Sequence, residues 1–179
     1  MPFRRLLNLL SLFALIVGSA HAESGKGAAN NKYTLSTSLW TQHFNPQPGQ
    51  NNNQNYIGLE RRGQNMLSIP LDARFPALEN ATPLLGFAFF NNSYYQSSVY
   101  AYAGYDYDIW QGDNSALYIK LTAGFIHGYR DEYQHKVPLN DYGTSPAAIP
   151  SFGFRYKQID SELVIFGVSG LMLLIGYNF

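Results

Sequence analysis

The sequence predicts an all-β fold, an eight-stranded antiparallel transmembrane β-barrel of an outer membrane. Of the 179 residues, 16% are aromatic and 13% are charged, and this charged fraction is about half of the roughly 25% found in ordinary soluble domains. Apolar and polar residues alternate along much of the chain, which is typical of strands with two unlike faces. A soluble β-sandwich would also alternate, but its solvated face would need more charged residues than this chain has.

Residues 1–22 are typical of a secretory signal peptide. Two arginines form the basic region, residues 6–17 form the apolar region, and Ala20-His21-Ala22 forms a cleavage site with small residues. The apolar run is shorter than the about 20 residues of a transmembrane helix, and no run of that length follows it. We therefore expect a polar lead-in over 23–32 and a single barrel domain over 33–179.

The rest of the chain divides into eight expected strands, each near the length that a tilted strand needs to cross a bilayer. In order, they are 33–44, 54–62, 84–92, 97–109, 116–127, 149–157, 162–168 and 170–179. The clearest carry an apolar residue at every second position. These positions are Leu85, Phe87 and Phe89; Val99, Ala101, Ala103, Tyr105, Tyr107 and Ile109; Leu117, Ile119, Leu121, Ala123 and Phe125; and Leu171, Leu173, Ile175, Tyr177 and Phe179.

An eight-stranded barrel has an interior just wide enough for side chains to fill, so a porin function is not expected. Asp106 and Asp108 share the inward parity of their strand, and we expect them to pair inside the barrel with a cation such as Lys120 or Arg155. Trp40, Trp110 and the tyrosines are expected to form girdles at the membrane interfaces.

Residues 63–83 fit this scheme least well. Short turns are normal on the periplasmic side of such barrels, yet alternate residues from Leu67 to Phe75 are apolar. The segment is consistent with an extra hairpin, an elongated third strand or a docked plug.

The topology gathers the chemically active residues at one rim. With both termini on the periplasmic side, the first, third and fifth strands end outside. All three histidines beyond the signal peptide, which are His43, His127 and His135, then fall at these outer ends or in the loop 128–148.

A histidine beside a hydroxyl and a polar orienting group forms a site for acyl transfer. We therefore single out His43 as a general base, because an imidazole can accept a proton near neutral pH. Ser93 is the candidate nucleophile or hydrogen-bond partner, and Asn92 could orient the imidazole. Solvated loop residues would give the same pattern, and the Asn/Gln run from Gln47 to Asn55 is expected to be a mobile outer loop.

Composition excludes several other function classes. The chain has no cysteine, which rules out disulfides, thiol nucleophiles and cysteine-based zinc sites. Its formal net charge is zero, so nucleic-acid binding has no electrostatic support. His127 and His135 lack the spacing of a metal motif, and we expect neither a metal nor a cofactor.

Laid out along these strands, the chain resembles the PagP-type lipid A palmitoyltransferases of Gram-negative outer membranes. Trp40-Thr41-Gln42-His43-Phe44 is similar to the family's Trp-His segment at the end of the first strand. Residues 86–94 are similar to its Phe-x-Asp-Ser-Trp segment, and Ala103-Gly104-Tyr105 follows at a similar distance. Thr122-Ala123-Gly124 with Arg130-Asp131 resembles its Thr-Ala-Gly and Arg-Asp stretch. Pro146 and Pro150 resemble the family's prolines near the start of its sixth strand.

The resemblance implies an enzyme that moves a palmitoyl chain from the sn-1 position of a phospholipid to lipid A, without a cofactor. His43 and Ser93 would take the places of the catalytic histidine and serine. Arg130 would contact a lipid phosphate or complete loop packing. Gly86, Ala88 and Gly104 would leave room for the acyl chain inside the barrel. The protein would act as a monomer in the outer membrane.

Three features depart from the family's pattern. Asn92 stands where the family has an aspartate. Residues 23–32 have no apolar face where the family has an amphipathic helix before its first strand, and the segment 63–83 has no counterpart in the family. If Leu35 and Leu39 face lipid, strict alternation would also turn His43 outward, so we expect a β-bulge or the start of the loop to turn it inward.

Two other functions remain open from the residues alone. The same His and Ser could serve an outer-membrane lipid hydrolase, a phospholipase or deacylase, with water as the acceptor. A non-enzymatic structural or adhesive barrel would instead fill its interior with a charged network.

Overall fold

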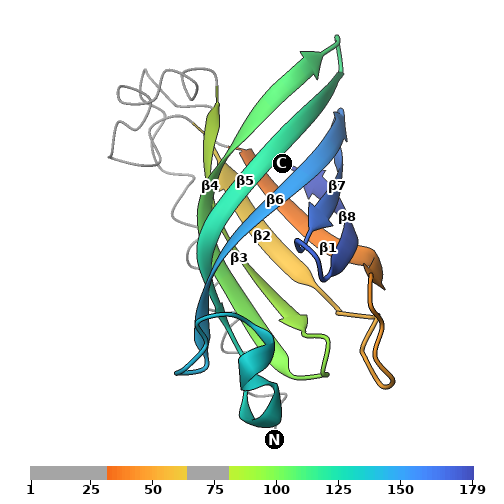
Figure 1. Cartoon of the computed structure of the whole chain (residues 1–179). Helices are drawn as coiled ribbons and strands as arrows, with labels where there is room; N and C mark the ends of the chain where they lie inside the picture. Colours follow the sequence, from red (N-terminus) through yellow and green to blue (C-terminus); the bar gives the residue numbers. More distant parts are fainter. Residues whose placement is uncertain (1–31, 64–80) are drawn as a thin grey trace, which may run out of the picture.

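The computed structural model describes residues 32–63 and 81–179, and these form a closed barrel of eight strands. Each strand pairs antiparallel with its sequence neighbours, and the first pairs with the last (Figure 1). In chain order the strands are β1 (Lys32–His43), β2 (Ile57–Arg62), β3 (Thr82–Asn91), β4 (Ser97–Gln111), β5 (Ser115–His127), β6 (Thr144–Tyr156), β7 (Ile159–Ile165) and β8 (Gly170–Asn178).

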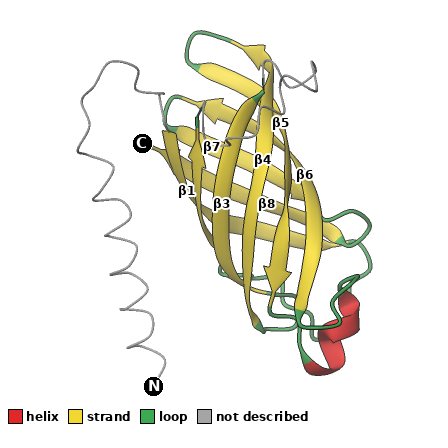
Figure 2. Ribbon diagram, turned by 90° about the vertical axis from the view of Figure 1, so that its left-hand side faces the viewer, coloured by secondary structure: helices red, strands yellow, loops and turns green. Residues whose placement is uncertain are grey.

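The expected all-β barrel with eight antiparallel strands is confirmed. A short 3-10 helix, η3 (Asp131–Lys136), lies in the connection between β5 and β6, at the lower end of the barrel in Figure 1 and in red in Figure 2. Among the described residues, no helix is long and apolar enough to cross a lipid bilayer.

Some expectations fall outside the described residues. The signal peptide 1–22 lies there, as does the lead-in except for Lys32, which begins β1. Most of the segment 63–83 lies there as well. β3 begins at Thr82, two residues before its expected start.

The start of β6 differs most from expectation. The strand was expected to begin at residue 149, but it begins at Thr144 and pairs with β5 along its whole length. Two prolines, Pro146 and Pro150, lie in this first part. Proline lacks a backbone donor and is tolerated at a sheet edge, and this part of β6 is an edge because β7 pairs only with Ser151–Tyr156.

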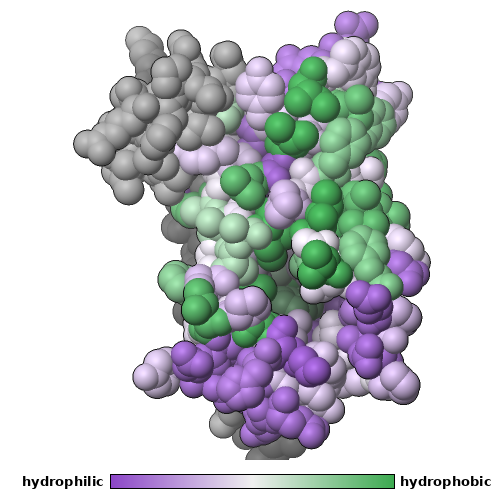
Figure 3. All heavy atoms as spheres, viewed as in Figure 1, coloured by the Kyte–Doolittle hydropathy of each residue, from purple (hydrophilic) through white to green (hydrophobic). Residues whose placement is uncertain are grey.

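The outer face of the barrel is apolar, as the alternation predicts. Large apolar side chains exposed on it come from all eight strands, and in Figure 3 apolar residues cover the middle of the face while hydrophilic ones gather at its lower end. Examples are Leu35, Ile57, Leu85, Ile109, Leu121, Phe154, Ile159 and Tyr177.

The interior is divided into two parts along the barrel axis. The part where β1 begins and β8 ends holds an ionic network. Asp106 pairs with Arg155 at 2.7 Å and with Arg62 at 3.1 Å, and Asp108 pairs with Arg155 at 3.0 Å. The expected pairing of both aspartates with Arg155 is confirmed, whereas Lys120 pairs with two glutamates instead.

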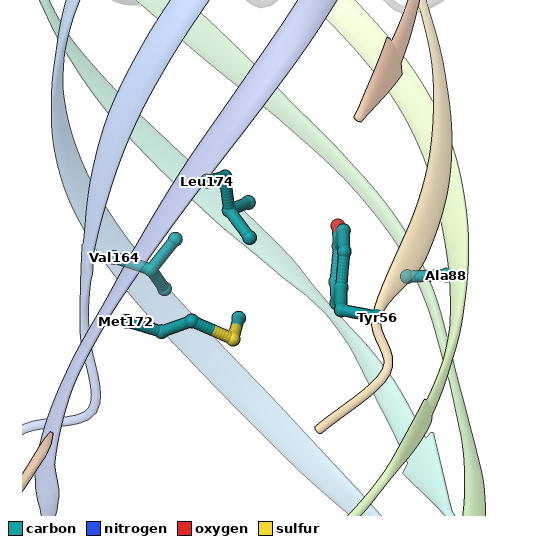
Figure 4. Packing of buried hydrophobic residues seen from close by; sticks show 5 residues of the cluster. All are labelled: Tyr56, Ala88, Val164, Met172 and Leu174. Carbon is teal, nitrogen blue, oxygen red and sulfur yellow. The ribbon is translucent and has the colours of Figure 1, made fainter. Parts of the chain in front are cut away.

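The other part of the interior is apolar. Tyr56, Ala88, Val164, Met172 and Leu174 form a buried cluster, and the larger of these side chains point into the barrel (Figure 4). They lie between the ionic network and the end of the barrel where β1 ends at His43, which we call the His43 rim.

Candidate functional site

His43 faces the interior because β1 contains a bulge. Ser38 pairs with Leu174 and Trp40 with Leu173, so that Leu39 is an extra residue in the ladder. Leu39 and Trp40 are both exposed, and the next alternate residues turn inward: His43 is 8% exposed. The expected bulge is confirmed, and it changes the parity of β1 just before the rim.

Ser93 lies in the turn that joins β3 to β4, and Asn92 shapes this turn. The Asn92 side-chain oxygen accepts hydrogen bonds from the backbone N–H of Tyr94 at 2.9 Å and of Gln96 at 3.1 Å. Its amide nitrogen donates to Ser98 Oγ at 3.1 Å. This is the asparagine turn geometry that fixes a backbone locally, and it directs the Asn92 amide at the turn and not at the imidazole.

The structure brings His43 and Ser93 into direct contact. His43 Nε2 lies 2.8 Å from Ser93 Oγ. The other ring nitrogen, Nδ1, lies 2.8 Å from Oδ1 of Asn52. The imidazole is therefore held between a hydroxyl and an amide oxygen, in the order serine, histidine, asparagine, and the orienting asparagine is Asn52 where the sequence indicated Asn92.

Asn52 reaches His43 because hydrogen bonds hold its loop against the turn that contains Ser93. The backbone N–H of Asn51 donates to the carbonyl of Ser93 at 2.9 Å, and the buried Asn51 side chain donates to the carbonyl of Asn92 at 3.1 Å. On the other side, Gln54 accepts a hydrogen bond from the backbone of Asn91 at 2.6 Å. The Asn/Gln run was expected to form a mobile outer loop. In the structure, polar groups of Asn51 and Gln54 connect it to its surroundings through hydrogen bonds, without apolar burial.

Tyr129 completes the surroundings of Ser93. Burial raises the pKa of the Tyr129 phenol above its ordinary value, and hydrogen bonding with the Ser93 side chain and backbone partly offsets this rise. Its ring meets that of Tyr94 edge-on, with 6.3 Å between centroids, and Tyr94 in turn stacks on Tyr133 at 4.0 Å. A phenol with a raised pKa stays protonated at neutral pH and can donate a hydrogen bond.

A cavity of about 520 Å³ opens at this site and extends into the barrel. His43, Ser93 and Tyr129 lie on its wall, as do the apolar side chains Tyr56, Val164 and Met172, and it reaches the ionic network at Lys120. This volume is within the roughly 300–1,000 Å³ of small-molecule sites. Thr41 Oγ1 and Gln54 Oε1, which are buried without a hydrogen-bond partner among the described residues, belong to cavity-lining side chains.

The three small residues expected to bind substrate lie elsewhere. Gly86 lies under the ring of Tyr102, and a Cβ at Gly86 would come within 2.4 Å of that ring. Ala88 is fully buried in the apolar cluster. A Cβ at Gly104 would clash with the backbone of β5 at 2.3 Å. In the described part of the chain, none of the three lines the cavity.

The remaining candidates lie at the rim outside the contact between His43 and Ser93. Arg130 is exposed, and its backbone N–H donates to the Gln96 side chain at 3.0 Å. His127 Nδ1 is bonded to Thr144 Oγ1 at 2.9 Å, and His135 lies in η3. No group of three or more possible metal-ligating side chains occurs within residues 32–63 and 81–179.

Sequence reasoning missed Asn52, whose side chain contacts the imidazole of His43. It belongs to a run of six consecutive candidates of the same kind, Gln50 to Asn55, and no periodic pattern distinguishes one of them. No protein-family model matches the sequence, and no curated protein matches it at a significant level.

Proposed function

We propose that this protein is an outer-membrane acyltransferase that moves a palmitoyl chain from a phospholipid to lipid A. The contact of 2.8 Å between His43 Nε2 and Ser93 Oγ, at the mouth of a cavity that leads into an apolar interior, carries the proposal. The resemblance of the segments around His43, Ser93 and Arg130 to PagP-type enzymes supplies the donor and the acceptor.

The outer surface supports a membrane location. Apolar side chains cover the barrel wall, and soluble proteins rarely expose a continuous apolar surface of this kind (Figure 3). Trp40 lies near the His43 rim and Trp110 near the opposite end, and both are about half exposed. Tryptophans at both ends of an apolar wall are typical of proteins anchored at two membrane interfaces.

Two gaps in strand pairing give lipids a path to the site. β1 pairs with β2 only up to Thr37, and β6 pairs with β7 only from Ser151 onward. The part of β6 that does not pair with β7 includes Ala147, Ala148 and Ile149, which line the cavity. An acyl chain could therefore enter the barrel sideways from the lipid layer without unfolding a paired ladder.

The proposed reaction is an ester exchange. His43 accepts a proton from the attacking hydroxyl and returns it to the glycerol oxygen that leaves, which is general acid–base catalysis. The apolar cavity holds the acyl chain away from water, and Arg130 at the rim supplies a positive charge near the lipid phosphates. We expect no metal or diffusible cofactor in this chemistry.

A lipid hydrolase is the second candidate, because the same His43 and Ser93 contact would also serve if water were the acceptor. A purely structural barrel is less well supported by the interior. Among the described residues, the ionic network fills the part of the interior where β1 begins and β8 ends, and an open cavity occupies the part next to the His43 rim.

The test is to express the chain in a Gram-negative host that lacks its own lipid A palmitoyltransferase and to compare lipid A by mass spectrometry. We expect a gain of one palmitoyl mass with the natural sequence and none with His43→Ala. His127→Ala is the matched control, because His127 is also at the rim but is bonded to Thr144. We expect it to keep the gain.

The other outcomes separate the candidates. Loss of an acyl chain from lipid A, or release of free fatty acid from phospholipid, would favour the hydrolase. An unchanged lipid A with the barrel folded in the membrane would contradict transfer to this acceptor.

A further inference from the structure

The hydrogen bond between Asn52 and His43 determines which ring nitrogen carries the proton. Oδ1 of Asn52 can only accept a hydrogen bond, and it lies 2.8 Å from Nδ1. Nδ1 therefore holds the proton. Nε2 is left with its lone pair, which faces the Ser93 hydroxyl at 2.8 Å. This is the tautomer that a base needs in order to take the proton from Ser93.

We propose that Ser93 is the nucleophile, that Asn52 is the residue that positions its base, and that the reaction passes through an acyl-Ser93 intermediate. The inference rests on the proposed function only for the kind of donor, an acyl ester. A histidine paired with an asparagine is a known form of such an arrangement.

The step is balanced without any further reactant. Ser93 Oγ forms a bond to the ester carbonyl carbon while Nε2 takes the hydroxyl proton. The bond from that carbon to the glycerol oxygen then breaks, and Nε2 gives the proton to the leaving oxygen. In the second half, a hydroxyl of the acceptor forms a bond to the acyl carbon while His43 Nε2 takes its proton. The bond from that carbon to Ser93 Oγ then breaks, and Nε2 gives the proton to Oγ.

Hydrogen bonds connect the loop that holds Asn52 to the turn that holds Ser93. Asn52 follows Asn51, whose backbone is bonded to the carbonyl of Ser93 itself. The Gln54 side chain donates to the carbonyl of Asn51 at 2.7 Å and closes the loop on itself. Hydrogen bonds therefore hold Asn52 and Ser93 together, although they are distant in sequence, and the imidazole of His43 lies between them.

A fluorophosphonate probe tests the proposal on the full folded chain in detergent micelles, because it labels a serine only when a neighbouring base activates it. We expect labelling at Ser93, located by peptide mass, and none in Ser93→Ala. Asn52→Ala should slow labelling by roughly 10- to 100-fold, part of the roughly 10²–10⁴-fold that a positioned base contributes. Faster migration on an unheated SDS gel shows that each variant is folded.

The conservative change and a matched control separate positioning from loop structure. Asn52→Asp keeps an oxygen acceptor for Nδ1 and should restore labelling, which a damaged loop would not allow. Asn53→Ala changes the neighbouring exposed asparagine and should leave the rate unchanged.

Two outcomes would overturn the inference. One is an unlabelled Ser93 in the natural sequence, above all if lipid A is still modified, since His43 would then act directly on the acceptor. The other is equal labelling of Asn52→Ala and the natural sequence. Because labelling needs no acceptor, a labelled Ser93 without lipid A modification would uphold the acyl-serine and refute only the proposed acceptor.

Discussion

The phenol of Tyr129 is a second polar contact of Ser93, the nucleophile that we propose. It is hydrogen-bonded to Ser93, and its pKa is raised by burial, so it remains a donor at neutral pH. A donor beside the proposed nucleophile would stabilise negative charge developing on the ester oxygen, and such a donor is worth more in a water-poor site than in solution.

We predict that Tyr129→Phe slows acyl transfer while the barrel remains folded. The ring and its edge-on contact with Tyr94 are kept, and only the hydroxyl is lost. Removal of one oxyanion donor costs roughly 10²–10³ in rate, and initial rates on a chromogenic acyl ester measure the change. Tyr133→Phe, which changes the partner of Tyr94 in the stacked pair, should keep the natural rate. Equal rates for both variants would refute a role for the Tyr129 hydroxyl.

At the scale of single residues, the sequence predicts the histidine and the serine of the site better than it predicts the residue that orients the imidazole. His43 and Ser93 were predicted together, and they are in contact. Asn92 was expected to orient the imidazole, but Asn52 does so. Strand periodicity predicts which strand ends meet at a rim, and it contains no information on how a polar loop folds back across that rim.

Among the elements, the bulge in β1 is the one on which the site depends most. If Leu39 took a regular place in the ladder, the alternation that turns Thr34 inward would turn His43 toward the outside. The sequence indicated this conflict of parity, and the structure resolves it with one inserted residue.

We predict that insertion of one alanine between Thr41 and Gln42 removes activity without unfolding the barrel. Each following residue of β1 would move one place along the ladder with β8, which reverses the side it faces, so the imidazole would leave the cavity and lose its contact with Ser93. Leu39→Ala is the matched control, because it keeps the residue count and the bulge, and it should label at Ser93 like the natural sequence. Fluorophosphonate labelling and unheated gel mobility measure the two effects. Normal labelling of the insertion variant would show that the parity of β1 does not position His43.

The edge of β6 shows where element prediction from sequence fails. Prolines and small residues over 144–150 favour a loop, yet the segment continues the strand because β5 pairs with it on one side only. Edge status depends on how far the next strand extends, which is a property of the closed barrel and not of the local sequence.

At the scale of the whole molecule, an ionic network lies beside the apolar cavity, on the side away from the His43 rim. Lys120 Nζ lies 3.0 Å from Glu60 and 2.5 Å from Glu162, and among the ion pairs of the described residues Glu162 has no other cation. All three side chains are largely buried, between 7% and 13% exposed. The network closes the cavity, and it holds β2, β5 and β7 together across the barrel.

We predict that Lys120→Met destabilises the barrel by about 3–5 kcal/mol, because it leaves the buried Glu162 without its cation and leaves Glu60 with its contact to Arg62 at 3.6 Å. The triple variant Glu60→Gln, Lys120→Met, Glu162→Gln removes both carboxylates as well, and it should recover most of the loss, since replacing a whole buried ionic group by neutral side chains is often tolerated. Urea unfolding in phospholipid vesicles, followed by tryptophan fluorescence, gives both free energies. If the single variant is as stable as the natural sequence, the network does not stabilise the fold. If the triple variant is as unstable as the single one, packing at Lys120 and not charge accounts for the loss.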